Sequence, residues 1–320
     1  MNDHLCCPGC RSKGLVFHQE SVECGNCRAT FPVMWGIPML INGIDAAKVK
    51  EAFLSEKRLF DSSILGIEKF KLDFHMKMLF YKFMKMTFPK LKSQYEYWAY
   101  RGKDYMDSFF DSDYIKLEIF FQNMLVEEMK RLEWRSFFEA GCGFGWNIKR
   151  VKEEFPQSTV GGIDFSLPQL YSGRNRYHKE FPEIATAGGD ATNIPYVDGA
   201  FDIGFSLGVF MNIHPSAIRK AISEMIRVSK KYIIHLEYDE AHATRELREK
   251  RRPKTNIISH DYAALYKEVG GSNVAIEKVL DYRDFSAACK VFTESQHIQF
   301  SRWEKWEGPS KYIFIVVRKK

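Results

Sequence analysis

The chain has 320 residues, of which 45% are hydrophobic and 28% are charged. These proportions exclude a disordered or fibrous protein, and the formal net charge of +6 permits an anionic partner without requiring one. No apolar run is long enough to span a bilayer, and the N-terminus lacks the basic start and apolar core of a secretory signal, so we expect a cytoplasmic protein. The length accommodates one large α/β domain and a smaller module.

Two CxxC pairs lie near the N-terminus: Cys7 with Cys10, and Cys24 with Cys27. Each pair can turn two thiolates toward one point, and two pairs joined by a short hairpin form the tetrahedral four-sulfur site that Zn²⁺ prefers. In a reducing compartment, cysteines clustered in this way favour a metal site over disulfides. We therefore predict a zinc ribbon over residues 1–43. Its Zn²⁺ ion is expected to be structural, because four thiolates leave no open coordination position.

Other features of this module leave alternatives open. Cys6 could replace Cys7 as a ligand, although the CxxC spacing favours Cys7, and a redox-active CxxC is the alternative to a metal site. The hairpin strands are predicted within residues 15–24. Gly9 and Gly25 are expected to supply the backbone freedom that the two knuckles need.

Residues 44–130 are predicted to form a helical linker or lid segment. Within it, residues 70–92 would place apolar side chains on two nearly opposite faces, with lysines at the edges between them. A helix that only lies on a membrane has one apolar and one polar side, so we favour burial inside the chain or in a homodimer. Contact of residues 70–92 with a membrane surface or a lipid carrier is the alternative.

Two further elements are predicted before residue 131. Residues 95–110 are rich in aromatic side chains, which indicates either a packed helix end or a lid over the site of the next domain. Residues 111–132 show the pattern of a long amphipathic helix that packs on the sheet of that domain, with 111–113 as its start.

Residues 131–320 alternate strands and helices. This pattern predicts a Rossmann-like α/β domain with a seven-stranded, mostly parallel sheet and helices on both faces. In such sheets ligands bind beyond the carboxyl ends of the strands. Asp190 and Asp202 are expected in loops. Strands are predicted within 134–140, 158–164, 184–210 (two strands), 230–238 and the tail (two strands, the last at 312–319), and helices at 146–155, 167–181 and 216–229.

A glycine-rich turn, "EAGCGFG", follows the first of these strands, with Gly141, Gly143 and Gly145 at alternate positions. A dinucleotide fingerprint has its third glycine inside the following helix, and this chain lacks a glycine there. Glu139, just before the turn, would repel a pyrophosphate but could accept hydrogen bonds from an ammonium group. The turn therefore favours a ligand with an amino-acid portion.

Together these motifs resemble the class I S-adenosylmethionine-dependent methyltransferases over residues 131–320. "EAGCGFG" matches their ExGxGxG motif, Asp164 matches the acid that takes both ribose hydroxyls, and "GDATNIPYVDGAFD" resembles the segment in which Asp190 and Ala191 frame the adenine. The first 43 residues resemble the small zinc-ribbon modules fused to bacterial methyltransferases or acting as their activators. The resemblance implies S-adenosylmethionine as cofactor, with contacts from Glu139, Gly141, Gly143, Gly145, Asp164, Phe165, Asp190, Ala191 and Leu207.

The chemistry implied by this resemblance is displacement at an activated methyl group, which needs mainly alignment of the reacting atoms. A general base is needed only if the acceptor is a hydroxyl or a protonated amine. Candidates are His235 and Glu237, which share one face of a strand by alternation, and His214 in the loop before them. Each could equally be a structural polar residue. His260 is expected to mark a helix start, with Ser259 as its cap.

The acceptor is the least constrained part of the prediction. We favour O- or N-methylation of a small molecule, a sugar or glycan, or a natural-product intermediate. The alternative is an RNA methyltransferase that docks its substrate with the zinc ribbon, although the net charge is small for that role. Catalysis could also have been lost in a regulatory binder, against which the intact glycine motif argues. Residues 245–252 could grip an anionic acceptor or be solvated, and residues 300–311 could border the acceptor pocket.

Overall fold

The computed structural model describes residues 4–54, 98, 102–103, 105–110, 114–177, 179–240, 259–297 and 312–320. The predictions for residues 70–92, 245–252 and 300–311 lie outside these residues, as does most of the predicted lid before residue 105. Among the described helices, none is long and apolar enough to cross a membrane.

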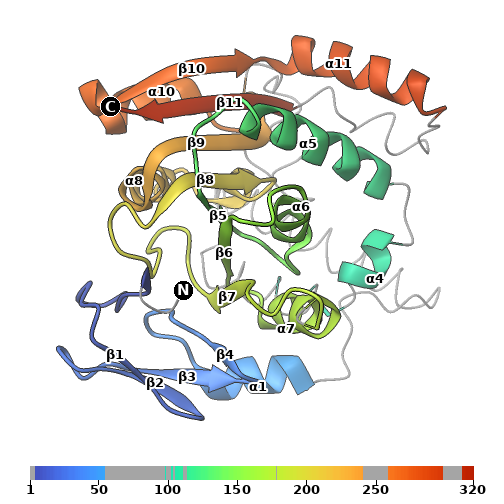
Figure 1. Ribbon diagram of the computed structural model, residues 1–320. Coiled ribbons are helices and arrows are strands. Elements are labelled where there is room, and N and C mark those ends of the chain that lie inside the picture. The colour runs from blue at the N-terminus through green and yellow to red at the C-terminus, as the bar shows by residue number, and fades with distance from the viewer. Residues whose placement is uncertain are drawn as a thin grey trace, which may run out of the picture.

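A seven-stranded sheet in the order β10-β11-β9-β8-β5-β6-β7 forms the centre of the fold (Figure 1). Strands β5 to β9 are parallel to their neighbours in this series, whereas β11 runs antiparallel to both β9 and β10. This confirms the predicted Rossmann-like sheet. The strands are β5 Ser136–Ala140, β6 Thr159–Asp164, β7 Ala185–Gly188, β8 Phe201–Leu207, β9 Ser229–Tyr238, β10 Val274–Leu280 and β11 Tyr312–Lys319.

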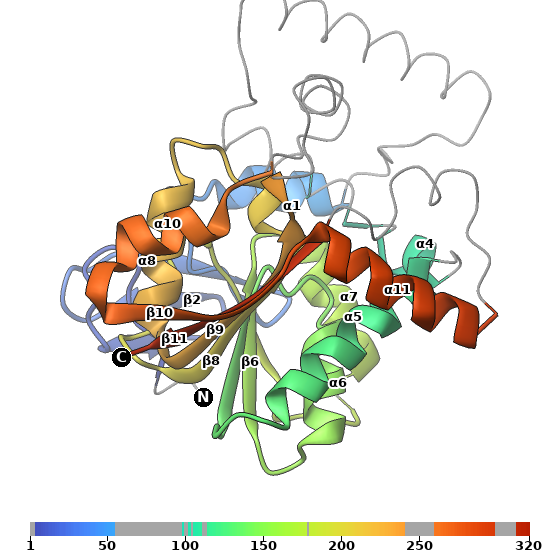
Figure 2. The ribbon, with the colours of Figure 1, turned by 90° about the horizontal axis from the view of Figure 1, so that it is seen from above.

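Helices cover both faces of the sheet (Figure 2). One face is covered by α5 (Tyr114–Met129), α6 (Trp146–Glu154), α7 (Leu167–Tyr177) and α11 (Tyr282–Ser295). The other face is covered by α8 (Ile218–Val228) and α10 (Tyr262–Gly270). Helix α5 packs on the sheet as its apolar pattern predicts, and the Phe121 ring lies 4.8 Å from that of Tyr312 on β11. Helix α11 was not among the predicted elements.

Two expectations about polar residues are wrong. Asp202 lies inside β8 and not in a loop, where its carboxylate accepts a hydrogen bond from the Arg135 amide at 2.8 Å. The cap of α10 is Asp261 and not Ser259, because only the Asp261 carboxylate accepts from the Ala264 amide of the first turn.

The N-terminal residues form a four-stranded antiparallel sheet of β1 (Leu15–Phe17), β2 (Ser21–Cys24), β3 (Thr30–Met34) and β4 (Ile37–Pro38). The β1–β2 hairpin matches the prediction, and β3 and β4 extend it. Two short helices follow along the chain, α1 (Ala46–Leu54) and α4 (Tyr105–Phe110).

This small sheet packs against the edge of the large one at β7 (Figure 1). Met39 pairs with Gly188 in a parallel bridge, and the Leu40 amide donates to the Gly188 carbonyl at 2.9 Å. The approach is close enough that a Cβ on Gly188 would lie 2.9 Å from the Met39 Cα atom. Val22 and Phe31 of the small sheet belong to the same buried cluster as residues of the large one. The contact therefore covers an edge that would otherwise expose unpaired backbone groups.

Candidate active site

A pocket opens at the carboxyl ends of β5, β6 and β8. The carboxyl ends of parallel strands meet at one edge of the sheet, so residues far apart in the sequence converge there. The loops after these strands supply most of the lining. Every predicted cofactor residue except Gly145 lies on its wall: Glu139, Gly141, Gly143, Asp164, Phe165, Asp190, Ala191 and Leu207.

The glycine turn bends from β5 into α6 with all three glycines in the left-handed region, at φ values of 77°, 53° and 82° for Gly141, Gly143 and Gly145. A side chain on Gly141 would collide with Val209, which lines the pocket from the loop after β8. Gly145 is the N-cap of α6, and a Cβ there would meet nothing within 4 Å. Its positive φ, which residues with a side chain rarely adopt, therefore accounts for glycine at this position.

Asp164, the last residue of β6, fixes the glycine turn. One carboxylate oxygen accepts from the Gly143 amide at 2.9 Å, and the other accepts from the Ser166 amide at 2.7 Å. Burial raises the pKa of Asp164 to about 6, although these amide hydrogen bonds favour the charged form. The carboxylate thus holds two loops together and also faces the pocket.

Glu139, in β5, is 2% exposed. Its Oε1 accepts from Asn147 Nδ2 at 2.7 Å, and Gln122 Nε2 donates to the Asn147 side-chain oxygen at 3.1 Å. Its Oε2 has no hydrogen-bond partner among the described residues. Burial raises the pKa of Glu139 to about 8, and the nearby carboxylates of Glu118 and Asp164 add to the effect. An unpaired buried oxygen costs free energy, so this position favours a positively charged ligand group.

Trp146 begins α6 and lines the same pocket. Its indole Nε1 is buried without a hydrogen-bond partner among the described residues. The ring packs edge-on against Phe109 and Phe110 of α4, with centroids 5.8 and 5.3 Å apart. An unpaired donor and the unpaired Glu139 acceptor in one pocket suit a ligand that carries both a negative and a positive group.

The far side of the pocket is formed by a tight turn after β7. The Asp190 carboxylate accepts from the Thr192 amide at 2.7 Å and from the Thr192 hydroxyl at 2.8 Å. The Asn193 amide donates to the Asp190 carbonyl at 2.8 Å. We call residues 190–193 the Asp190 turn. It presents Asp190, Ala191 and Thr192 to the pocket.

Several lining residues were not singled out from the sequence. Asn147 and Gln169 belong to no recognised motif, but Asn147 is a polar residue on the buried face of α6, beside Ile148. A buried polar residue on an otherwise apolar helix face is the signal that could have found it. Trp98, Tyr105 and Phe109, from the segment predicted as either a packed helix end or a lid, also lie on the pocket wall.

His235 does not lie on the pocket wall. It is fully buried on the α8/α10 face of β9, where its ring nitrogens lie 2.6 Å from the Ser206 hydroxyl and 2.6 Å from the Tyr266 hydroxyl. Burial lowers its pKa to about 3, so the ring is neutral. Both nitrogens are engaged inside the core, which gives His235 a structural role in place of the one suggested from the sequence.

Glu237 lies on the same face of β9, as strand alternation predicts, and is also absent from the pocket wall. Its carboxylate accepts from the Ser206 hydroxyl at 2.7 Å and from the amides of Val209, Phe210 and Met211 at 3.1 Å each. Burial raises its pKa to about 7. These bonds make Glu237 the anchor of the loop after β8, four residues of which line the pocket: Gly208, Val209, Asn212 and Ile213.

His214 follows these lining residues without lining the pocket itself. Its Nδ1 lies 2.6 Å from the Ser216 hydroxyl in the turn that leads to α8. None of the three predicted bases therefore lines the described pocket wall.

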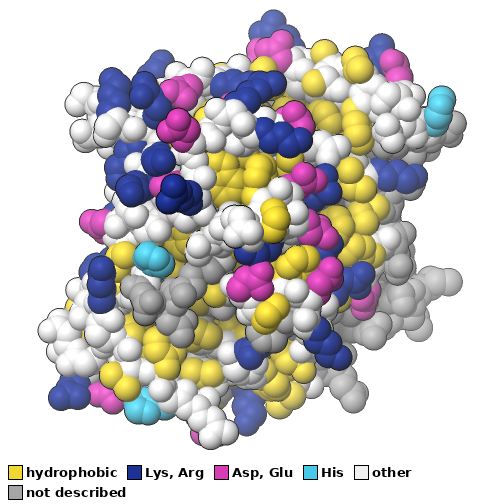
Figure 3. All heavy atoms as spheres, viewed as in Figure 1, with side chains coloured by type: hydrophobic (Ala, Val, Ile, Leu, Met, Phe, Trp, Pro, Cys, Tyr) yellow, Lys and Arg dark blue, Asp and Glu magenta, His cyan; other side chains and the backbone are white. Residues whose placement is uncertain are grey.

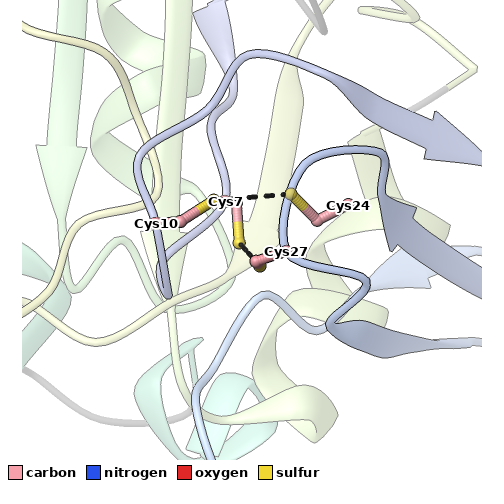
Figure 4. Close-up of side chains that lie close together, drawn as sticks. All are labelled: Cys7, Cys10, Cys24 and Cys27. Carbon is pink, nitrogen blue, oxygen red and sulfur yellow. Dashed lines mark hydrogen bonds between the residues drawn. The ribbon is translucent and has the colours of Figure 1, made fainter.

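The four predicted metal ligands converge from two loops (Figure 4). The Sγ atoms of Cys7 and Cys27 are 3.6 Å apart, as are those of Cys10 and Cys24, and all four lie within 4.8 Å of one another. Sulfur atoms around a tetrahedral Zn²⁺ at 2.3 Å would be about 3.8 Å apart, so the cluster fits the ion. Cys6 is buried but does not belong to this cluster.

The two knuckles share one backbone conformation. The amide of Arg11 donates to the Cys7 carbonyl at 2.8 Å, and the amide of Arg28 donates to the Cys24 carbonyl at 2.9 Å. Both arginines have positive φ values, 63° and 62°. The left-handed residue of each knuckle is therefore the arginine after its second cysteine, and Gly9 and Gly25, which are expected to supply backbone freedom, do not have positive φ values.

A family model described as a methyltransferase domain matches residues 137–232. This stretch runs from β5 into β9 and includes the glycine turn, Asp164 and the Asp190 turn. Together with the seven-stranded sheet and the position of the pocket, the match identifies residues 137–232 as part of a class I, Rossmann-like methyltransferase domain.

Individual relatives are similar over parts of the chain. Demethylmenaquinone methyltransferase from Paenarthrobacter aurescens is 43% identical over 72 residues, 22% of this chain and 26% of that protein. Malonyl-[acyl-carrier protein] O-methyltransferase from Buchnera aphidicola is 30% identical over 111 residues, 34% of this chain and 40% of that protein. The matched regions thus span less than half the length of these curated relatives.

Among solved structures, the fold is similar to that of geranyl diphosphate C-methyltransferase from Streptomyces coelicolor A3(2), in complex with S-adenosyl-L-homocysteine. The alignment covers 62% of this chain and 79% of that one, with 16% identity and a TM-score of 0.48.

Proposed function

We propose that this protein transfers a methyl group from S-adenosylmethionine to a nucleophilic atom of a small organic acceptor. The observation that carries the proposal is the pocket wall, where the unpaired oxygen of Glu139 lies in one cavity with Asp164 and the Asp190 turn. When bound, S-adenosylmethionine supplies a methyl group activated by a positively charged sulfur.

The residues of the wall match the parts of such a donor. Glu139 would accept from the ammonium group, and the Trp146 indole would donate to the carboxylate, because each has a buried polar atom with no hydrogen-bond partner in the described part of the chain. Asp164 would accept from the ribose hydroxyls through a charge-assisted hydrogen bond. Asp190, Ala191, Phe165 and Leu207 would surround the adenine.

The chain's own contribution to the reaction is mainly alignment and exclusion of water. The loop after β8 is held rigid by Glu237 and places Asn212 and Ile213 on the wall, where an acceptor can meet the methyl group. No histidine lies among the described lining residues. A deprotonated oxygen, a neutral nitrogen or an activated carbon could accept the methyl group there without a histidine base.

A small acceptor is supported by three observations. The aromatic side chains of Trp98, Tyr105 and Phe109 give the pocket an enclosing apolar side. The names of the two curated relatives specify demethylmenaquinone and malonyl-[acyl-carrier protein] as acceptors. On the face drawn in Figure 3, basic, acidic and hydrophobic side chains of the described residues are interspersed, unlike the continuous basic surface typical of RNA binding.

We also propose that the four-cysteine cluster holds a structural Zn²⁺ ion. The sulfur separations fit tetrahedral coordination, and backbone and side-chain groups already support thiolates. The Gly9 amide donates to Cys7 Sγ at 3.3 Å, and Asn26 Nδ2 donates to Cys10 Sγ at 3.4 Å. The cluster and the pocket are separate sites.

Calorimetric titration with S-adenosylmethionine, followed by product analysis, tests the proposed function. We expect one donor molecule bound per chain, and transfer of a labelled methyl group to the low-molecular-weight fraction of a cell extract. Label found only in the RNA fraction would overturn the small-acceptor assignment. No measurable donor binding would overturn the proposed function itself.

Replacing Glu139 with Gln is expected to weaken donor binding about tenfold at pH 7.5, because a charge-assisted hydrogen bond to the ammonium becomes a neutral one. The wild-type pKa of about 8 means that Glu139 must lose a proton to bind the ammonium. Wild-type affinity should therefore rise from pH 6 to pH 7.5, with proton release visible as a buffer-dependent binding enthalpy. In the variant both effects should be smaller, because Asp164, whose pKa is about 6, still titrates in the pocket and residue 139 does not. Proton release as large as in the wild type would contradict this role of Glu139.

The same substitution should stabilise the unliganded protein. The folded-state pKa of Glu139 lies far above the usual value of 4.5, so between these values the folded state binds a proton that the unfolded state does not. Stability contributed by this position is present below pH 4.5 and is lost as the pH rises toward 8. Thermal unfolding at pH 8 should therefore show a higher Tm for Glu139→Gln than for the wild type, by a few degrees.

A further inference from the structure

Arg11 connects the first cysteine knuckle to the Asp190 turn. It follows Cys10, and its guanidinium donates to the Asn193 side-chain oxygen at 2.6 Å and to the Ile194 carbonyl at 2.7 Å. Asn193 closes the Asp190 turn by donating its own amide to the Asp190 carbonyl. One side chain of the metal-binding module thus reaches the end of a turn that lines the donor pocket.

The knuckle backbone contacts the same residue. Asn193 Nδ2 donates to the carbonyl of Pro8 at 3.0 Å, and Pro8 lies between the two cysteines of the first pair. Asn42 Nδ2 donates to the Pro8 carbonyl at 3.0 Å as well. Both ends of the Asn193 amide group are therefore held by residues 8–11, whose conformation depends on the four-cysteine cluster.

The residues after the turn run alongside the knuckle. The Cys6 amide donates to the Pro195 carbonyl at 2.9 Å, and Leu5 pairs with Tyr196 in an antiparallel bridge. Glu224 of α8 completes the junction, since it accepts from the Ile194 amide and from Arg11, each at 2.8 Å. Glu224 is buried, which would raise its pKa, but Arg227 and Arg11 outweigh burial and lower it. The junction is thus a partly buried, charge-assisted network in which Arg11 and Glu224 form the ion pair.

We propose that Arg11 is a positioning residue of the donor site, and that metal binding by the four-cysteine cluster and donor binding in the pocket are thermodynamically coupled through it. This inference rests on the proposed function. It gives residues 8–11 of the small module the role of holding the Asp190 turn, which lies on the side of the pocket proposed for the adenine. Coupling is reciprocal, so metal should tighten donor binding and donor should tighten metal binding by the same free energy.

Arg28 supplies a matched control. It occupies the equivalent place in the second knuckle, with φ of 62° against 63° for Arg11. Its side chain is exposed, however, and its guanidinium donates to the Glu23 carboxylate of β2 at 3.1 Å. Arg11→Ala and Arg28→Ala therefore remove the same residue from the same backbone conformation, and only the first breaks the link to the Asp190 turn.

The test is calorimetric titration of the zinc-loaded wild type, Arg11→Ala, Arg11→Lys and Arg28→Ala with S-adenosylmethionine, after metal content has been measured for each. We expect full zinc in all four, about tenfold weaker donor binding in Arg11→Ala, and a change below about twofold in Arg28→Ala. Arg11→Lys should be intermediate, because one ammonium cannot replace the forked contacts of a guanidinium. Equal affinities in Arg11→Ala and Arg28→Ala would overturn the inference while leaving the proposed function intact.

The reciprocal arm uses the wild-type protein and a chromogenic zinc chelator. At equilibrium with the chelator, saturating S-adenosylmethionine should raise the zinc affinity several-fold in the wild type and have little effect in Arg11→Ala. If the donor binds the wild type yet leaves its zinc affinity unchanged, coupling is absent. Failure of the wild type to bind the donor at all would instead reject the proposed function.

Discussion

Asp164→Ala is expected to reduce the affinity for S-adenosylmethionine by about 100-fold or more, the largest effect we anticipate for one substitution in the pocket. The change removes the acceptor proposed for the ribose hydroxyls and also frees the amides of Gly143 and Ser166, which now donate to the two carboxylate oxygens. Each hydrogen bond to a charged group contributes about 1.5–3 kcal/mol, so two or more lost together give an effect of this size. Calorimetric titration measures it.

Asp281→Ala is the control for this experiment. The Asp281 carboxylate also accepts from two backbone amides, those of Arg283 and Asp284, but it caps α11 and does not line the pocket. This variant should lose some stability and keep its donor affinity. If Asp164→Ala binds S-adenosylmethionine as tightly as Asp281→Ala, the placement of the ribose at Asp164 is wrong.

Cys24→Ser is expected to abolish stoichiometric zinc binding and to lower the Tm by roughly 5–10 °C. Three thiolates with one hydroxyl form a much weaker site for Zn²⁺, and structural zinc ions contribute directly to folding free energy. The loss of stability should extend beyond the small module, because Cys24 and Val22 belong to the same buried cluster as Phe138 and Tyr196 of the large domain. Metal analysis and thermal unfolding provide the two readouts.

Cys6→Ala separates the two possible ligand sets. Cys6 is buried beside the cluster without belonging to it, so this variant should retain one zinc ion per chain. Loss of zinc in Cys6→Ala, with retention in Cys7→Ala, would show that Cys6 replaces Cys7 as a ligand. A wild-type protein without zinc would contradict the metal assignment altogether.

The sequence alone determined the parts of this protein in which local residues carry the chemistry. Two CxxC pairs predicted a four-sulfur cluster because a knuckle is built from neighbouring residues. The order of strands and helices predicted the Rossmann-like sheet. Because parallel strands end at one edge, the glycine turn, Asp164 and Asp190 could be assigned to one pocket before any contact was known. Gly145 belongs to the same motif, and the structure places it at the turn into α6 with a positive φ.

Tertiary structure decided the roles that depend on what a side chain faces. His235 and Glu237 lie near the end of a strand beside the pocket, as a catalytic pair could, but strand alternation turns both side chains toward the α8/α10 face. There the polar atoms of both side chains form hydrogen bonds with Ser206, Tyr266 and three loop amides. Arg11 is an unremarked residue after a cysteine until the fold brings it to Asn193, 182 positions further along the chain. Burial and long-range contact set both roles. Neither quantity is encoded in spacing or composition, because each depends on segments that meet only after the chain has folded.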